Sequence, residues 1–172
     1  MADLETLIRE ARDADSADLI ALIGGCYAEY PGCVLDIERE APWLLASATA
    51  YAGWEGRLWV AERAGKVVGS GGFRPRAPGI GGVHHLYVDR SARRRGLATR
   101  LLCLIEAEVR RRGWHRVDLW SDTRFTDAHR LYQRLGFVRS PGTRELDDLS
   151  RSVEYHFAKS LAVPTPSPQL AR

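Results

Sequence analysis

The chain of 172 residues is long enough for one domain with a hydrophobic core and too short for two of ordinary size. Its composition, 45% hydrophobic and 27% charged, is that of a globular protein and excludes global disorder, while the net charge of +3 indicates no particular partner. The sequence shows neither a membrane-spanning apolar run nor the basic and apolar regions of a signal peptide. Three cysteines without disulfide or zinc-site spacing predict a reducing, cytoplasmic location.

The first half of the chain predicts a strand, two helices and a β-hairpin. A short strand at residues 7–10 precedes a helix whose apolar residues recur at helical spacing and which ends near Tyr30. A second helix is expected over residues 37–52. Two strands at residues 57–62 and 66–73, joined by an Ala-Gly turn, form the hairpin.

The second half alternates strands with helices after a Pro/Gly-rich loop at residues 74–82. The expected elements are a strand at 83–88, a helix at 94–112, a strand at 116–120, a helix at 126–135, and strands at 137–139 and 153–157. The helix at 94–112 carries a wide apolar stripe. With the strands before and after it, this helix forms a βαβ unit, which is right-handed with parallel strands.

These elements predict an α/β (α+β) fold in which a mixed sheet of about seven strands has helices on both faces. The order of elements is β-α-α-β-β-β-α-β-α-β-β. We expect a single domain over residues 1–160. The remaining residues, 161–172, have proline at every second position from Pro164 to Pro168 and predict a disordered tail.

An arginine-rich turn before the long helix is the most informative segment of the chain. Residues 90–116 contain nine arginines and two glutamates, a local charge of +7, so the rest of the chain carries −4. The first N–H groups of a helix lack intrahelical partners and lie at the positive end of its dipole, where a pyrophosphate can bind. Gly96 and Ala98 permit a close approach of the ligand to the backbone. The same residues also suit an ordinary solvated helix start.

Two motifs in this half of the chain resemble those of the GNAT superfamily of N-acetyltransferases. Arg93-x-x-Gly96-x-Ala98 is similar to the family's coenzyme A-binding pattern Q/R-x-x-G-x-G/A, and residues 128–137 resemble its A-x-x-L-Y-x-x-x-G-F segment. The order of elements also matches that of the family, over nearly everything except the tail. The resemblance implies direct transfer of the acetyl group of acetyl-CoA to a primary amine of a small molecule or peptide, in a ternary complex and without a metal.

The resemblance also implies where acetyl-CoA binds. In the family, the pantetheine arm lies along the strand before the turn as an added strand, so the backbone of Leu86 and Val88 holds it here. The N–H group of Val88 then points at the thioester carbonyl. The cofactor-binding residues implied are Leu86, Tyr87, Val88, Arg93, Arg94, Arg95, Gly96, Leu97, Ala98 and Thr99.

Tyr132 and His84 are the candidate catalytic residues. Tyr132 matches the family's tyrosine that protonates the departing thiolate, and a phenol with a pKa near ~10 is protonated at neutral pH; packing within its helix is the alternative role. The family's glutamate base falls on Gly82 here. Strand alternation places His84 on the same face as residue 82, and His85 on the opposite face unless a bulge intervenes. His84 is therefore the candidate base, or else only lines the sheet.

The acceptor site is expected to include Tyr27, Tyr30 and Trp120, and the acidic remainder of the chain suits a cationic amine. We expect a monomer or homodimer whose partners are acetyl-CoA and an amine, with no nucleic acid and no membrane. Two alternatives stay open. The missing glutamate is compatible with a non-catalytic domain that binds CoA as a sensor, and the arginines are compatible with a nucleic-acid-binding module.

Overall fold

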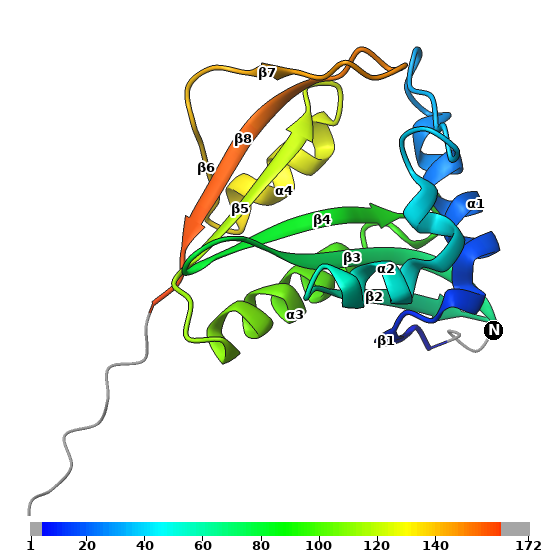
Figure 1. Cartoon of the computed structure of the whole chain (residues 1–172), viewed down its shortest axis with the longest axis horizontal. Coiled ribbons are helices and arrows are strands. Elements are labelled where there is room, and N and C mark those ends of the chain that lie inside the picture. The colour runs from blue at the N-terminus through cyan, green and yellow to red at the C-terminus, as the bar shows by residue number, and fades with distance from the viewer. Residues whose placement is uncertain (1–4, 163–172) are drawn as a thin grey trace, which may run out of the picture.

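The computed structural model describes residues 5–162 and places eight strands in one sheet (Figure 1). The strands are β1 (Leu7–Glu10), β2 (Arg57–Arg63), β3 (Lys66–Ala77), β4 (Ile80–Val88), β5 (Arg116–Asp122), β6 (Val138–Arg139), β7 (Arg144–Glu145) and β8 (Val153–Ser160). Their order in the sheet is β1-β2-β3-β4-β5-β8-β6, and β7 pairs with β8. Since β4 and β5 are parallel and their neighbours antiparallel, the predicted mixed sheet is confirmed.

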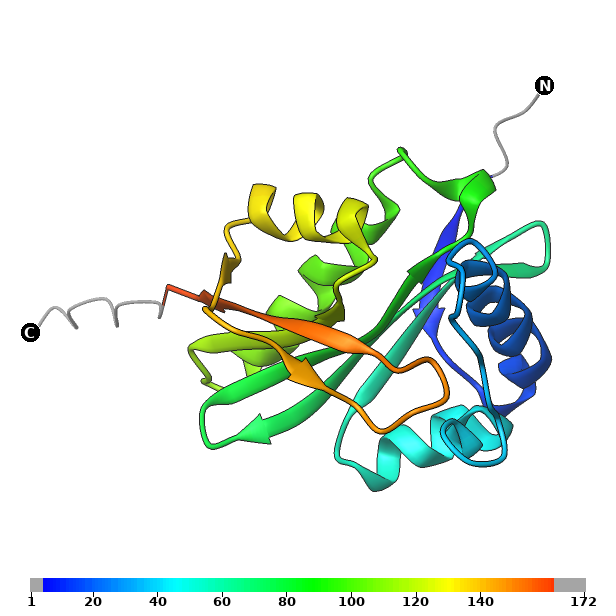
Figure 2. The same cartoon turned by 90° about the horizontal axis from the view of Figure 1, so that it is seen from above.

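Helices cover both faces of the sheet, as predicted (Figure 2). The helices are α1 (Ser16–Tyr27), α2 (Ser47–Gly53), α3 (Leu97–Arg111) and α4 (Thr126–Arg134), with 3₁₀ turns η1 (Asp13–Asp15), η2 (Pro42–Ala46) and η3 (Arg90–Ala92). One hydrophobic core lies under α1 and α2, around Leu19 and Tyr51, and a second lies under α3 and α4, around Leu101 and Phe157. No helix within residues 5–162 is long and apolar enough to cross a bilayer.

The two parallel strands, β4 and β5, separate soon after they begin. Their pairing covers only residues 80–82 of β4 and 116–118 of β5. Beyond this point β4 continues beside β3, whereas β5 continues beside β8, and the strands diverge (Figure 1). The sheet therefore has a V-shaped opening whose closed end lies at Gly82 and Asp118.

Three predicted elements differ from the structure. The loop expected at residues 74–82 is instead the end of a hairpin, because Pro75 pairs with Gly81 and the turn is confined to residues 78 and 79. The helix expected over residues 37–52 is divided into η2 and the shorter α2. The predicted disordered tail begins with Leu161, which is buried, and its residues 163–172 lie outside the described part of the chain.

A buried carboxylate fastens the end of α3 to the sheet. The Glu108 side chain is only 1% exposed and accepts hydrogen bonds from Arg111 (2.7 and 2.8 Å), Arg112 (2.8 Å) and Arg57 of β2 (3.1 Å). These guanidinium groups, Arg111 first, lower the pKa of Glu108 from 4.5 to about 2. Part of the positive charge of residues 90–116 is thus paired within the fold.

We expect Glu108→Gln to lower the free energy of unfolding by about 2 kcal/mol at pH 7, because it removes a buried charge from three arginines. The pKa is lower in the folded state, so the carboxylate stabilises fully above pH 4.5 and loses this contribution as the pH falls toward 2. Urea unfolding at pH 7 and at low pH measures the difference. Glu38→Gln, at an exposed position, is the control. A Glu108→Gln effect that does not shrink with acid would contradict this assignment.

Candidate functional site

Two cavities lie where β4 and β5 separate. The large cavity, about 460 Å³, is lined by the end of β4, the start of α3 and the inner side of α4. The small cavity, about 250 Å³, is lined by β4, β5 and the segment that joins β7 to β8. Leu86, Tyr87, Phe125 and Tyr132 line both. These four residues therefore mark the junction of the two cavities.

The start of α3 forms one wall of the large cavity. Gly96 precedes the helix in the left-handed conformation (φ 72°), and Arg94 has a positive φ of 61°, so the helix begins three residues later than predicted. The first helical hydrogen bond runs from the Arg100 N–H to the Gly96 carbonyl (3.0 Å). The N–H groups of residues 97–99 come before that bond, in residues that line the cavity. This arrangement suits a pyrophosphate.

Arg93 has a different environment from the other arginines of the turn. Its Nε donates to the Val88 carbonyl (2.9 Å), and its two terminal nitrogens donate to Glu29 (2.5 and 2.7 Å) beyond the end of α1. The ion pair with Glu29 raises the pKa of Arg93. Arg93 thus joins α1 to the turn, with its charge balanced within the protein.

A β-bulge in β4 determines which side chains face the small cavity. The pairing of β4 with β3 shifts between His84 and Tyr87, and His85 has a left-handed φ of 51°. The His85 ring stacks on Trp43 (4.0 Å between centroids), and the Tyr51 hydroxyl lies 2.6 Å from its Nδ1. Simple alternation therefore ends at this bulge, the exception allowed for His85, and the rings of His84 and His85 lie 6.0 Å apart between centroids.

His84 occupies space left by the absent side chain at residue 82. A Cβ at Gly82 would lie 2.8 Å from the His84 Nε2. Burial, and then the positive charges of Arg74, Arg76 and Arg144, lower the pKa of His84 to about 4. The imidazole is consequently neutral at pH 7 and can accept a hydrogen bond or pass on a proton, but it does not retain one.

Tyr132 projects from α4 into the junction of the cavities. Its ring is buried against Phe137 and Phe157 (centroids 5.9 and 5.5 Å away), and the Ser121 side chain lies near it. Burial raises the pKa of Tyr132 well above that of a free phenol. The hydroxyl therefore stays protonated at neutral and moderately alkaline pH, as a proton donor requires.

Two of the three residues predicted for the acceptor site line the small cavity. Tyr27 does so with its hydroxyl 3.2 Å from that of Tyr87, and Trp120 lies on β5. Tyr30 instead lines the large cavity, against Phe125.

Sequence reasoning missed two arginines in the small cavity, Arg76 at the end of β3 and Arg144 on β7. Arg76 lay in the segment read as a loop. Had β3 been recognised as extending to this point, its alternation would have placed Arg76 on the same face as Arg74.

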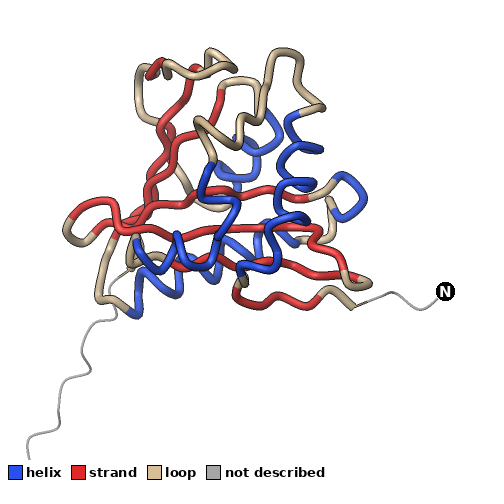
Figure 3. The backbone as a smooth tube through the Cα atoms, turned by 45° about the vertical axis from the view of Figure 1, so that its right-hand side comes forward, coloured by secondary structure: helices blue, strands red, loops and turns tan. Residues whose placement is uncertain are grey.

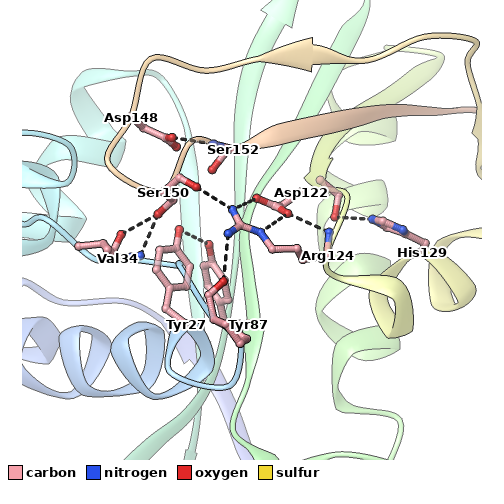
Figure 4. A network of polar contacts seen from close by, with 11 residues as sticks. Tyr27, Val34, Tyr87, Asp122, Arg124, His129, Asp148, Ser150 and Ser152 are labelled. Carbon is pink, nitrogen blue, oxygen red and sulfur yellow. Dashed lines mark hydrogen bonds and ion pairs between the residues drawn. The ribbon is translucent and has the colours of Figure 1, made fainter.

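Two loops close the rim of the small cavity, and they lie together at the open end of the molecule (Figures 1 and 3). The Val34 N–H donates to the Ser150 hydroxyl (2.8 Å), which joins the loop after α1 to the loop before β8. Arg124 forms a bidentate pair with Asp122 (2.6 and 2.8 Å) and also donates to the Ser150 carbonyl (3.2 Å), as Figure 4 shows. The rim is thereby anchored to the end of β5.

Comparison with known proteins agrees with this geometry. The model of the acetyltransferase (GNAT) family matches residues 23–137. The chain belongs to the GNAT family. A mycothiol acetyltransferase from Salinispora tropica is 33% identical over 137 residues, which are 73% of this chain and 42% of that protein. The chain thus spans about two fifths of the length of this curated relative.

Solved structures share the fold. A GNAT-family acetyltransferase from Staphylococcus aureus superposes with a TM-score of 0.77 at 17% identity, over 92% of this chain and all of that one. A Salmonella typhimurium protein solved with its cofactor acetyl-CoA gives a TM-score of 0.69 at 19% identity, over 96% and 99% of the two chains. The predicted fold class and the family resemblance are therefore confirmed.

The unusual environment of His84 can be measured directly. We expect NMR titration of the imidazole to give a pKa of about 4 for His84, against about 6.5 for an exposed histidine, because the ring is buried beside three arginines. The spectrum of His84→Asn assigns the signal among the five histidines. A value near 6.5 for His84 would show that the ring is solvated and outside the cavity.

Proposed function

We propose that this GNAT protein is an acetyl-CoA-dependent N-acetyltransferase that transfers the acetyl group directly to an amine bound in the small cavity. The observation that carries the proposal is the position of Tyr132, a buried residue of the wall shared by the two cavities. Acetyl-CoA supplies an acetyl group activated as a thioester. A cofactor held in the large cavity and an acceptor held in the small one would meet at this wall.

The large cavity fits the cofactor in both charge and shape. The N–H groups of residues 97–99 would bind the pyrophosphate, and Arg94, which also lines the cavity, would add positive charge. The backbone of Leu86 and Val88 would hold the pantetheine arm alongside β4. Arg93, already paired with Glu29, would orient the turn rather than neutralise a phosphate.

Two side chains would move protons at the junction. Tyr132 would donate its hydroxyl proton to the departing sulfur, because its raised pKa keeps that proton in place until the thiolate forms. His84 would accept a proton from the acceptor amine at Nε2 and pass it on, since a pKa of about 4 prevents the imidazole from holding it. An ammonium with a pKa near ~10.4 must lose a proton before it can attack.

The cysteines support direct transfer rather than a covalent acetyl-enzyme. Cys26 is buried, with its sulfur 3.7 Å from the Val88 carbonyl oxygen, and Cys33 lines the small cavity. Burial raises the pKa of both thiols, so neither is a thiolate at neutral pH. Cys103 is exposed on α3 and lines neither cavity.

Calorimetric titration with acetyl-CoA tests the first step. We expect saturable binding that Ala98→Glu weakens about tenfold or more, because the new carboxylate would stand at the anion-binding start of α3. Ala107→Glu places the same charge on an exposed part of the same helix, outside the cavity, and should bind like the unmodified protein. Absence of binding at millimolar acetyl-CoA would overturn the proposed function.

Tyr132→Phe tests the proton donor. We expect kcat to fall about a hundredfold or more, with the Kd for acetyl-CoA nearly unchanged, because the variant keeps the ring packing and loses only the hydroxyl. Thiol release during turnover and calorimetry measure the two quantities. Tyr155→Phe, on β8 and outside both cavities, is the matched control. An unchanged kcat in Tyr132→Phe would remove Tyr132 from the chemistry.

A further inference from the structure

The charged side chains of the small cavity are mostly paired with one another. Asp122 is bound by Arg124, and Glu154 accepts from Arg144 (2.7 Å). Asp148 accepts the N–H of Ser152 (2.7 Å). Of these three carboxylates, only Asp148 forms no ion pair within residues 5–162, so the acidic side chains offer little uncompensated negative charge to a ligand.

Asp118, the fourth acidic residue, is saturated by partners other than Arg76. Arg116 binds both of its oxygens (2.6 and 3.1 Å), and the His156 Nε2 lies 3.0 Å from Oδ2. The Arg76 Nε is 3.9 Å from the same Oδ2, a long ion pair beyond hydrogen-bond distance, and the Arg76 side chain forms no hydrogen bond with any residue in the range 5–162. Its guanidinium group, about one third exposed, is thus available to a ligand.

A second unused donor lies beside Arg76. The indole N–H of Trp120 is buried and has no acceptor among the described residues, which is costly for a polar group. The Arg76 guanidinium lies 5.9 Å from the Trp120 ring, and that of Arg144 stacks on it at 4.1 Å. Two cations and an unsatisfied N–H donor are therefore gathered at one end of the cavity, around one aromatic ring.

We propose that the acceptor amine also carries a carboxylate, which Arg76 binds at the Trp120 end of the small cavity. The class of acceptor is a small amino acid or a similar amino-carboxylate. This inference rests on the proposed function, since it specifies the acceptor of that reaction. A planar guanidinium with free N–H groups matches a carboxylate in geometry and charge.

The surroundings of His84 support an anionic ligand. All the charged groups that shift its pKa are cations, namely Arg74, Arg76 and Arg144, and they act in the same direction as burial. A carboxylate on Arg76 would offset part of this positive potential and raise the pKa of His84. The acceptor would thereby make the imidazole a better proton acceptor. A polyamine, in contrast, would add positive charge to the same place.

Matched pairs of acceptors, in which one member lacks only the carboxylate, test the proposal. L-alanine is compared with ethylamine, L-methionine with 3-(methylthio)propylamine, and L-phenylalanine with phenethylamine, by thiol release and product mass. We expect the carboxylate-bearing member of at least one pair to have the higher kcat/KM, by about tenfold or more. Arg76→Gln should abolish that preference, mainly through KM. Arg139→Gln, which removes an exposed arginine outside both cavities, should preserve it.

A binding measurement makes the test independent of turnover. N-acetyl-L-alanine, N-acetyl-L-methionine and N-acetyl-L-phenylalanine, the products from these acceptors, are titrated while the His84 imidazole is followed by NMR. At least one should raise the pKa of His84 in the unmodified protein and leave it unchanged in Arg76→Gln. The acetyl-CoA affinity should be equal in the two proteins, since Arg76 does not line the large cavity.

The outcomes separate the two proposals. If acetyl-CoA binds and the amines without a carboxylate react as well as the amino acids, the enzyme stands and the carboxylate site is wrong. If none of the acceptors reacts, the product titration decides, and absence of an Arg76-dependent response overturns the carboxylate site. Failure of acetyl-CoA to bind overturns the proposed function, whatever the products do.

Discussion

The separation of β4 from β5 after three residue pairs is the constraint on which the whole site depends. It creates the opening in which both cavities meet. On the α1–α2 face of the sheet, the Tyr51 hydroxyl contacts the left-handed His85, which forms the bulge in β4. Residue 72 has to be glycine, because a Cβ there would lie 2.0 Å from the Tyr51 oxygen. The course of β4 just before Leu86 is therefore packed against a buried tyrosine that lines neither cavity.

The nine arginines of residues 90–116 have different roles in the structure, although they carry the same charge. Arg111 and Arg112, at the end of α3, bind Glu108. Arg116 binds Asp118, and Arg93 is paired with Glu29. Arg94 lines the large cavity. The sequence charge of +7 in this segment thus overstates what a ligand would meet, and the proposed cofactor site would depend more on backbone N–H groups than on side-chain charge. Conversely, the acidic residues of the small cavity are largely neutralised, so the negative balance of the rest of the chain does not make an anionic pocket.

Local patterns were sufficient for the fold and for finding the segments that line the large cavity. The apolar stripe of α3, the turn ending in Gly96 and the segment around Tyr132 are contiguous in sequence, and so are the elements they specify. The small cavity was less predictable because the segments that line it are far apart in the sequence. Arg76 and Arg144 meet only through the pairing of the sheet, and residues 74–82 resembled a loop because Pro75 and several glycines are rare within strands. The bulge at His85 could not be located from the sequence either, because the left-handed conformation of a histidine depends on tertiary contacts and not on its neighbours in sequence.

The glycine at residue 82 has a structural consequence beyond the absence of a glutamate. The His84 imidazole occupies the position that a side chain at residue 82 would need, with its Nε2 2.8 Å from the site of the missing Cβ. A glutamate at residue 82 and the observed conformation of His84 are therefore mutually exclusive on this backbone. A carboxylate there would be an anionic proton acceptor beside three arginines, whereas the neutral imidazole adds no negative charge beside them. The exchange of glutamate for glycine and histidine thus alters the charge that the cavity presents to its acceptor, and a ligand that brings its own carboxylate restores the balance.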